Sequence, residues 1–220
     1  MPPKPQVSPL ASGRTYRGIG PAARDADRRA RLLAAGLDAF GTRGYPASSI
    51  EALCSAAGVS TRNFYDHFAN REALLIAVYD EIVSAAQAEL ASALGAVVAG
   101  SPIAVWARAG VEAFTGFMLE DPRRARVNFI EVVGASQAVE RHRRAVLGQF
   151  AALLRATVEA LIASGQLSAR SGAVKHVQVA VLIGGVQESI TDWVSTAEDE
   201  RMPLDDVVDA LVEIVVLVAN

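Results

Sequence analysis

Apolar residues recur at spacings of three and four along nearly all of the chain, which is the pattern of amphipathic helices. The first such stretch places Leu32, Leu33, Leu37 and Phe40 on one face. Neither a hairpin dipeptide nor a run of alternating apolar and polar residues is visible. The pattern therefore predicts an all-α fold of about nine helices. Breaks containing Gly or Pro are expected at 100–102, 121–122, 134–136, 164–166 and 201–203.

Short helices with recognisable end signals follow the first one. Ser48 and Glu51 have the spacing of a capping box, in which the hydroxyl accepts from the Glu51 backbone N–H and the carboxylate reaches back. This helix is expected to end at Gly58. Ser60 can cap a further short helix over 61–68, and Asn70 can cap a fourth helix that runs through Leu74, Leu75 and Val78.

The arrangement of these two short helices has the spacing of a helix-turn-helix. A helix of about nine residues, a turn of three centred on Gly58 and a second short helix suit a motif whose second helix enters the DNA major groove. Gly58 supplies the left-handed backbone that ends the first helix. The residues expected to fill the wedge between the helices are Leu53, Ala57, Val59 and Phe64, with the small Cys54 allowing close approach.

This segment resembles the DNA-binding domain of TetR family transcriptional regulators. The resemblance is carried by Gly44-Tyr45, 56–60, 64–68 and 70–74, with Arg71 standing where a Lys is commoner. It implies an N-terminal three-helix reading head and a C-terminal helical domain that binds a small molecule and forms a homodimer. The implied function is that of a ligand-responsive repressor, released from an inverted-repeat operator in double-stranded DNA by a small apolar molecule.

Seven residues of the head are expected to contact DNA. Thr61, Arg62 and Asn63 form the first turn of the recognition helix, which faces base edges in such docking. Arg62 can bond guanine bidentately and Asn63 adenine, while Thr61 suits a methyl group or a phosphate. For Tyr65 and His67 the alternative is a packing role. The residues expected nearer the rims, where they would hold phosphates, are Ser48, Tyr65, His67 and Arg71.

The charge distribution supports a two-part chain. The protein has 220 residues, 51% of them hydrophobic, and a net charge of -3. Residues 1–71 contain ten Lys/Arg against five Asp/Glu, a net charge of +5, whereas residues 72–220 contain eleven against nineteen, a net charge of -8. The N-terminal part is therefore the one that would attract a polyanion. We expect a DNA-binding domain over 23–71 and a ligand-binding and dimerisation domain over 72–220.

The first residues have a different composition from the rest. Five of the nine prolines lie at positions 2, 3, 5, 9 and 21, among Ser, Gly and Gln. Such a segment buries too little apolar surface to offset its ordering entropy. Residues 1–22 are therefore predicted to be a disordered basic arm, either a solvated leader or an arm that reaches nucleic acid.

Two C-terminal stretches, 173–194 and 207–218, are apolar on nearly every side. A helix of this kind must be buried all round, yet the last two helices of such a chain cannot both be central. A subunit interface resolves this, and the alternative is a monomer core. The resemblance implies a four-helix bundle between subunits. The expected interface residues are Val181, Gly184, Gly185, Glu188, Leu211, Val215 and Val218.

Large side chains concentrate in the middle helices, where the resemblance implies a ligand pocket. The alternative for each of them is simple core filling. The residues that could line an apolar cavity are Trp106, Phe114, Phe117, Met118, Phe129, Gln149 and Phe150. The possible polar anchors are Asn128, Gln149, Gln187 and Glu188.

The sequence gives no support to an enzyme. His67, His142 and His176 are scattered without ligand spacing, and there is no Gly-rich phosphate loop and no nucleophile motif. We therefore expect no metal and no cofactor. The single Cys54 fits a reducing cytoplasm, and the apolar stretch 207–219 is too short and too charged to span a membrane. The rival hypothesis is a helical carrier or sensor of hydrophobic molecules whose head no longer reads DNA.

Overall fold

The computed structural model describes residues 20–163, 165 and 172–219, and within them every regular element is a helix. The helices are α1 (Pro21–Thr42), α2 (Ile50–Ala57), α3 (Thr61–His67), α4 (Arg71–Gly95), α5 (Ile103–Glu120), α6 (Pro122–Arg126), the π-helical turn η1 (Val127–Glu131), α7 (Gln137–Ala163), α8 (Gly172–Ser195), the 3-10 turn η2 (Glu198–Glu200) and α9 (Leu204–Ala219). The all-α prediction is confirmed. The breaks expected at 100–102, 121–122, 134–136 and 201–203 separate successive helices. Residues 164 and 166, and nearly all of the predicted arm, lie outside the described residues.

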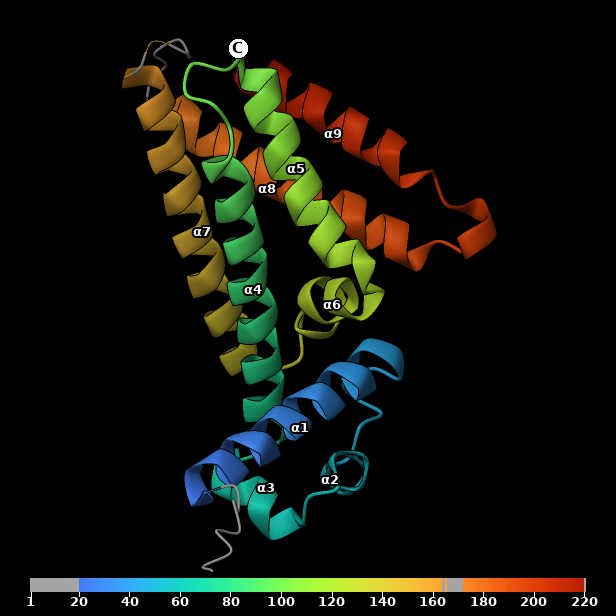
Figure 1. Ribbon diagram of the computed structural model, residues 1–220. Coiled ribbons are helices and arrows are strands. Elements are labelled where there is room, and N and C mark those ends of the chain that lie inside the picture. Colours follow the sequence, from blue (N-terminus) through green and yellow to red (C-terminus); the bar gives the residue numbers. More distant parts are fainter. Residues whose placement is uncertain (1–19, 164, 166–171, 220) are drawn as a thin grey trace, which may run out of the picture.

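The molecule has a small end and a large end, joined by α4. Figure 1 shows α1, α2 and α3 together at one end, which we call the head. From there α4 runs into a body that it forms with α5, α7, α8 and α9. Between the two parts lies α6, which contacts α1 on one side and α5 and α8 on the other. The head is therefore attached to the body through α4 and α6, and η1, which follows α6, also contacts α1.

The first turn of α2 begins one residue later than the sequence pattern predicts. Ser49, not Ser48, is the N-cap, and its hydroxyl accepts from the Ala52 N–H at 3.2 Å. Ser48 is buried, and its hydroxyl donates to the Gly44 carbonyl at 2.8 Å. Gly44 has φ +90°, so the turn before α2 brings this carbonyl within reach of Ser48. The capping-box prediction for Ser48 is thus wrong by one position.

The other end signals lie where they were expected. Gly58 adopts the left-handed conformation, with φ 61° and ψ 39°, at the end of α2. Ser60 caps α3 by accepting from the Asn63 N–H, and Asn70 caps α4 by accepting from the Ala73 N–H at 2.8 Å. Each cap satisfies an N–H that has no partner within its own helix.

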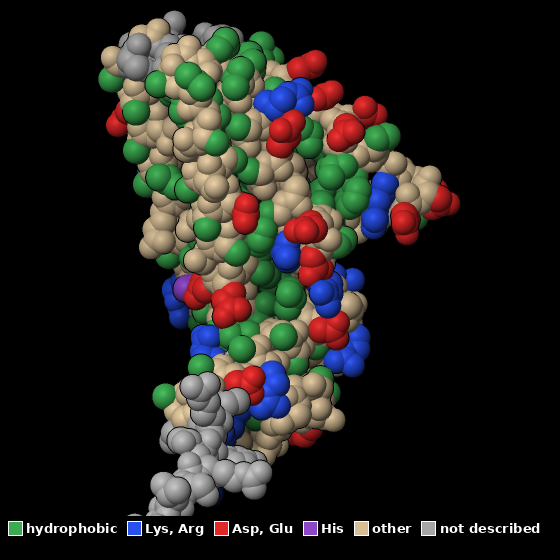
Figure 2. Space-filling model, in the orientation of Figure 1, with side chains coloured by type: hydrophobic (Ala, Val, Ile, Leu, Met, Phe, Trp, Pro, Cys, Tyr) green, Lys and Arg blue, Asp and Glu red, His purple; other side chains and the backbone are tan. Residues whose placement is uncertain are grey.

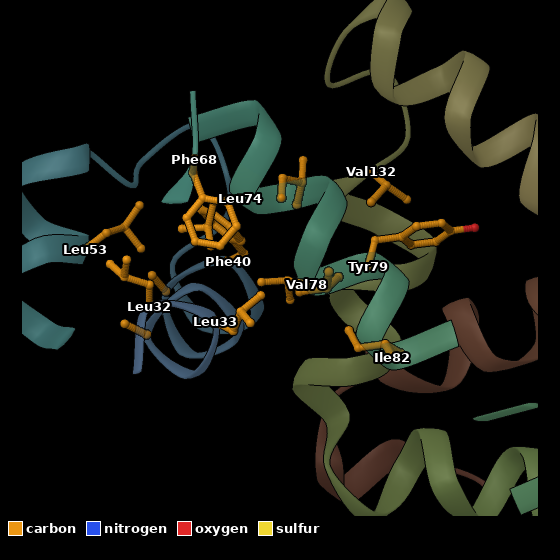
Figure 3. Close-up of a cluster of buried hydrophobic side chains, with 14 of the residues drawn as sticks. Leu32, Leu33, Phe40, Leu53, Phe68, Leu74, Val78, Tyr79, Ile82 and Val132 are labelled. Carbon is orange, nitrogen blue, oxygen red and sulfur yellow. The ribbon is translucent and has the colours of Figure 1, made fainter. Parts of the chain in front are cut away.

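One hydrophobic core extends from the head into the body. Leu32 and Phe40 from α1 pack with Leu53 from α2, and Leu74 and Val78 from α4 complete the cluster (Figure 3). The same cluster continues past Tyr79 and Ile82 to the side chains of α5, η1 and α8. Complete burial of a Leu or Phe side chain contributes about 1.5–3 kcal/mol to the stability of the folded state. The apolar face of α4 therefore stabilises both parts at once.

A close approach between α1 and α6 forms the second attachment. A Cβ atom at Gly41 would lie 2.4 Å from the Cβ of Arg123, a distance that no side chain tolerates. Beside this contact, Arg123 donates to Asp38 of α1 at 3.1 Å and to Asp121 at 2.8 Å. These carboxylates, chiefly Asp121, raise the pKa of the Arg123 guanidinium. The absence of a side chain at Gly41 is thus what lets the two helices touch.

Candidate nucleic-acid interface and ligand cavity

The recognition helix α3 is anchored by aromatic side chains and exposes its other face. Phe64 and Phe68 are buried, with their ring centroids 5.8 Å apart. Thr61 and Arg62 are exposed, Asn63 is half-buried, and Tyr65 has 55% of its surface exposed. The first turn of α3 therefore presents donors and acceptors outward on a fixed backbone.

The structure places three of the seven predicted contact residues in supporting positions. Arg71 donates to the carbonyl oxygen of Ser48, and its guanidinium carbon lies 4.3 Å from the centre of the Tyr45 ring. The side chain of His67 is 7% exposed and points to α1, where its Nε2 lies 3.5 Å from Asp25 Oδ1. The predicted phosphate contacts of Ser48 and His67 are therefore corrected, because neither side chain is available at the surface. For Arg71 the contact stays a prediction.

The body contains an apolar cavity of about 260 Å³ between α4, α5, α7 and α8. Five predicted lining residues lie on its wall: Trp106, Phe114, Met118, Phe129 and Phe150. The Phe114 ring is central, with its centroid 6.2 Å from that of Phe150 and 6.5 Å from that of Phe129. Of the predicted polar anchors, Asn128 and Gln187 also lie on the wall.

Three predicted pocket residues lie elsewhere. Phe117 is on another face of α5, under Arg124, whose guanidinium carbon is 4.3 Å from the ring centre. Gln149 and Glu188 are exposed to solvent. Their neighbours Phe150 and Gln187 face the cavity instead, because adjacent positions on a helix point about 100° apart. The expectation that these three residues line the pocket is therefore wrong.

The cavity is elongated along the helices. Its wall includes residues from Ile103 to Met118 on α5 and from Tyr79 to Leu94 on α4, and at 1.5 Å per residue each stretch spans about 22 Å. Among the described residues, none that line it is Asp, Glu, Lys, Arg or His. Burial raises the pKa of the Tyr79 phenol, at one end of the wall, to about 12.

Helix α7 supplies one long side of this cavity. Among the described helices it alone is long and apolar enough to cross a membrane, by length and composition only. Its apolar residues Val146, Leu147, Phe150 and Leu154 line the cavity. At the start of α7, residues of the basic run 141–144 make ion pairs within the chain. His142 lies 2.6 Å from Asp80, and Glu140 accepts from the two neighbouring arginines.

The π-helical turn η1 touches both the cavity and the head. Asn128 and Phe129 lie on the cavity wall. Two residues later, Glu131 accepts from the Tyr45 backbone N–H at 2.7 Å and from Arg126 Nε at 3.0 Å. The Glu131 side chain is only 7% exposed. Sequence reasoning missed Glu131, because a single acidic residue in an apolar stretch carries no local signal for a partner 86 positions away.

The predicted interface residues divide between the two last helices. On α8, Val181, Gly184, Gly185 and Glu188 are all exposed, as that prediction requires. On α9 the expected residues face inward: Leu211 is buried against α5, and Val215 and Val218 line the cavity. The exposed apolar side chains of α9 are Ile214 and Leu217. The prediction that Leu211, Val215 and Val218 form the subunit interface is therefore wrong, because this side of α9 packs against α5 and the cavity.

Charge differs along the described surface. In Figure 2, Asp and Glu side chains gather over α9 and the η2 turn, whereas Lys and Arg side chains appear over α6 and α1. Helix α8 ends at that acidic turn. Acidic side chains thus predominate around α9 and the η2 turn, away from the basic side chains of α6 and α1.

Comparison with known proteins places the head in a family. Residues 32–78 match the sequence profile described as "Bacterial regulatory proteins, tetR family". Over 100 residues the chain is 29% identical to the HTH-type transcriptional regulator EthR of Mycolicibacterium smegmatis, and the match spans 46% of this chain and 45% of that relative. The chain thus matches about half the length of this relative.

Solved structures share the whole fold. The fatty acid degradation regulator FadR of Bacillus halodurans superposes with a TM-score of 0.76 and 18% identity, covering 91% of this chain and 97% of the other. FadR of Bacillus subtilis, solved in complex with stearoyl-CoA, gives 0.74 and 18%, covering 85% and 97%. Both solved structures are named as regulators, and at 18% identity they show that this chain has the same fold. Residues 32–78 of the chain thus carry the sequence pattern of the tetR family of bacterial regulatory proteins, and the chain as a whole shares the fold of these solved structures.

Proposed function

We propose that the protein is a homodimeric, cytoplasmic repressor that binds an inverted-repeat operator and is released from it by a small apolar molecule in the body cavity. The observation that carries this proposal is η1, where Asn128 and Phe129 line the cavity and Glu131 holds the Tyr45 backbone of the head. A ligand that moves η1 necessarily acts on the turn that precedes α2.

The exposed first turn of α3 supports DNA reading. Arg62 suits a bidentate contact to guanine and Asn63 one to adenine, and Thr61 suits a methyl group or a phosphate. Tyr65 is exposed one turn further along α3, in reach of a phosphate or sugar. The net charge of +5 over residues 1–71 favours association with a polyanion.

The α8 and α9 surface supports a dimer. Val177 and Val181 are 60% and 55% exposed on α8, and Leu217 is 77% exposed on α9. A Cβ atom at Gly184 or Gly185 would meet nothing within 4 Å in this chain, so these glycines leave room for a partner helix. A two-fold dimer sets its two recognition helices about 34–36 Å apart, or at a multiple of that, which implies an inverted-repeat operator.

The switch requires a difference between two conformations. A ligand releases DNA only if it binds better to the conformation whose two heads are wrongly spaced for the operator. By reciprocity, operator DNA must weaken ligand binding by the same factor. The stearoyl-CoA complex of Bacillus subtilis FadR, a protein of the same fold, supports an effector with a long apolar chain.

The test is selection of bound DNA from a random pool, followed by measurement of its release by apolar compounds. An inverted repeat that is recovered repeatedly, and released by a compound that also binds the free protein, is the expected result. Recovery of no sequence preference by a protein that still binds apolar compounds would overturn the repressor and favour a carrier of hydrophobic molecules.

A further inference from the structure

Two buried polar atoms on the cavity wall have no hydrogen-bond partner. They are the indole Nε1 of Trp106 and the amide Oδ1 of Asn128. Asn128 is more than nine-tenths buried, with a relative exposure of 8%. A buried polar atom without a partner is costly, and in native structures such an atom calls for an explanation. The wall therefore offers one donor and one acceptor that nothing in the described chain uses.

The two atoms lie toward opposite ends of the cavity. Trp106 is in the first turn of α5, whereas Asn128 belongs to η1, which follows the far end of α5 and contacts α1 of the head. From Trp106 to Met118 the wall along α5 covers about 18 Å at 1.5 Å per residue. Between the two ends the wall is almost entirely apolar, with Val111, Phe114 and Phe150 among its residues.

The wall also lacks charge. An ionised carboxylate or phosphate moved from water into such a cavity would lose several kcal/mol of solvation unless a cation paired with it. No described lining residue is an Arg, a Lys or a His. An ionised group is therefore disfavoured inside the cavity.

From these observations we propose that the effector is an uncharged, elongated apolar molecule. It carries a hydroxyl or amide N–H that donates to Asn128 Oδ1 near the head, and an acceptor oxygen toward the other end that receives the Trp106 indole N–H. This inference rests on the proposed function, because it names the ligand class of the same cavity. It separates this protein from a regulator that takes an anionic acyl-CoA.

The ligand class is tested by direct binding to the full-length wild-type protein without DNA. Four probes share a twelve-carbon chain: 1-dodecanol, its methyl ether, dodecanoate and 1,12-dodecanediol, which supplies the second oxygen. Stearoyl-CoA, with an eighteen-carbon chain, represents the acyl-CoA class. The ether accepts a hydrogen bond but cannot donate one. We expect the alcohol to bind about tenfold more tightly than the ether, and the diol at least as tightly as the alcohol, since one hydrogen bond to a buried atom has about this effect. Dodecanoate should bind more weakly than either.

Two variants connect the preference to the two atoms. Asn128→Leu removes the acceptor and should abolish the tenfold advantage of the alcohol over the ether. Trp106→Phe removes the indole N–H and should weaken the diol more than the ether. Circular dichroism checks that each variant is folded, and the wild-type order of the probes stands as a test whether or not a variant folds.

The outcomes separate the ligand class from the repressor function. Tighter binding of dodecanoate or stearoyl-CoA than of the alcohol, equal binding of alcohol and ether, or no binding of any probe would overturn the proposed ligand class. If the expected order is found but no bound probe weakens operator binding, the ligand class stands and the switch fails. If stearoyl-CoA binds best and releases DNA, the switch stands and the ligand class fails.

Discussion

The carboxylate of Glu131 accepts the backbone N–H of Tyr45 at 2.7 Å, so a residue of the body fixes the turn before α2. Next to that turn, the Tyr45 ring lies under the Arg71 guanidinium, which in turn donates to the Ser48 carbonyl. A chain of three contacts thus runs from η1 to the start of the helix-turn-helix. Because η1 also forms part of the cavity wall, the same residues are placed to carry a ligand-dependent change to the head.

Removal of the Glu131 carboxylate should weaken both folding and the coupling of ligand to DNA. Glu131→Ala leaves the Tyr45 N–H without its partner, and we expect a loss of about 1–3 kcal/mol in the free energy of unfolding. Urea denaturation measures this. The control is Glu112→Ala, which removes an exposed ion pair with Arg108 and should cost less than about 1 kcal/mol. Equal losses in the two variants would contradict the role of Glu131.

Arg62 should determine base preference without affecting stability. Its side chain is exposed and makes no hydrogen bond or ion pair with a described residue. Arg62→Ala is expected to cost about 1–3 kcal/mol in operator binding and to relax the preference at one base pair, with thermal unfolding unchanged. Arg71→Ala should instead lower stability, because the turn at Tyr45 loses its support. Fluorescence anisotropy on operator and random DNA, at several salt concentrations, checks both. A loss for Arg62→Ala that is equal on operator and random DNA would refute direct readout.

Phe114 and Phe117 form a matched pair on one helix with different expected effects. Phe114 lines the cavity, whereas Phe117 lies under Arg124 outside it. Phe114→Leu should change the affinity for an apolar ligand several-fold and leave ligand-free DNA binding nearly unchanged. Phe117→Leu removes the same number of atoms, so we expect it to lower the free energy of unfolding about as much as Phe114→Leu does. It should leave the affinity for the ligand unchanged. Titration calorimetry with 1-dodecanol would show a changed affinity in both variants if the cavity assignment were wrong.

Leu217 and Val215 distinguish a subunit interface from the interior of one chain. Leu217 is 77% exposed on α9, while Val215 lines the cavity. Leu217→Arg is therefore expected to give a folded, soluble monomer, because the charge enters only the interface between copies. Val215→Arg should destabilise the fold itself by burying an unpaired charge. Light scattering reports the mass, and a wild-type monomer at micromolar concentration would rule out the dimer.

Local signals in the sequence were sufficient to predict most ends of the helices in the head. Gly58, Ser60 and Asn70 act within four residues of where they stand, so the ends that they define could be predicted. Ser48 failed because the next residue is also a serine, and only the path of the chain through Gly44 decides which hydroxyl faces the helix. The order of the helices and the helix-turn-helix followed from the same local rules.

The direction in which a side chain of the body points, inward or outward, depends on helices that are distant in the sequence. Spacing shows that α9 is apolar almost all round, but not that Leu211 faces α5 while Leu217 faces outward. Phe117 and Gln149 were placed in the pocket by residue type, and one position along a helix was enough to turn each away from it. Glu131 and Tyr45 are joined across 86 positions. No window of sequence contains that relationship.

The hydrophobic core that joins the head to α4 determines whether the head can fold without the body. Leu74, Leu75 and Val78 belong to α4, yet they close the apolar cluster formed by α1, α2 and α3. A fragment ending at residue 71 would leave Leu32, Phe40 and Phe64 open to water on the side that α4 covers. We expect such a fragment to be unfolded and quickly digested by protease, whereas one extended through the first turns of α4 should gain protection. A transfer of this head to another body would therefore have to include the first turns of α4, the helix that goes on to line the cavity.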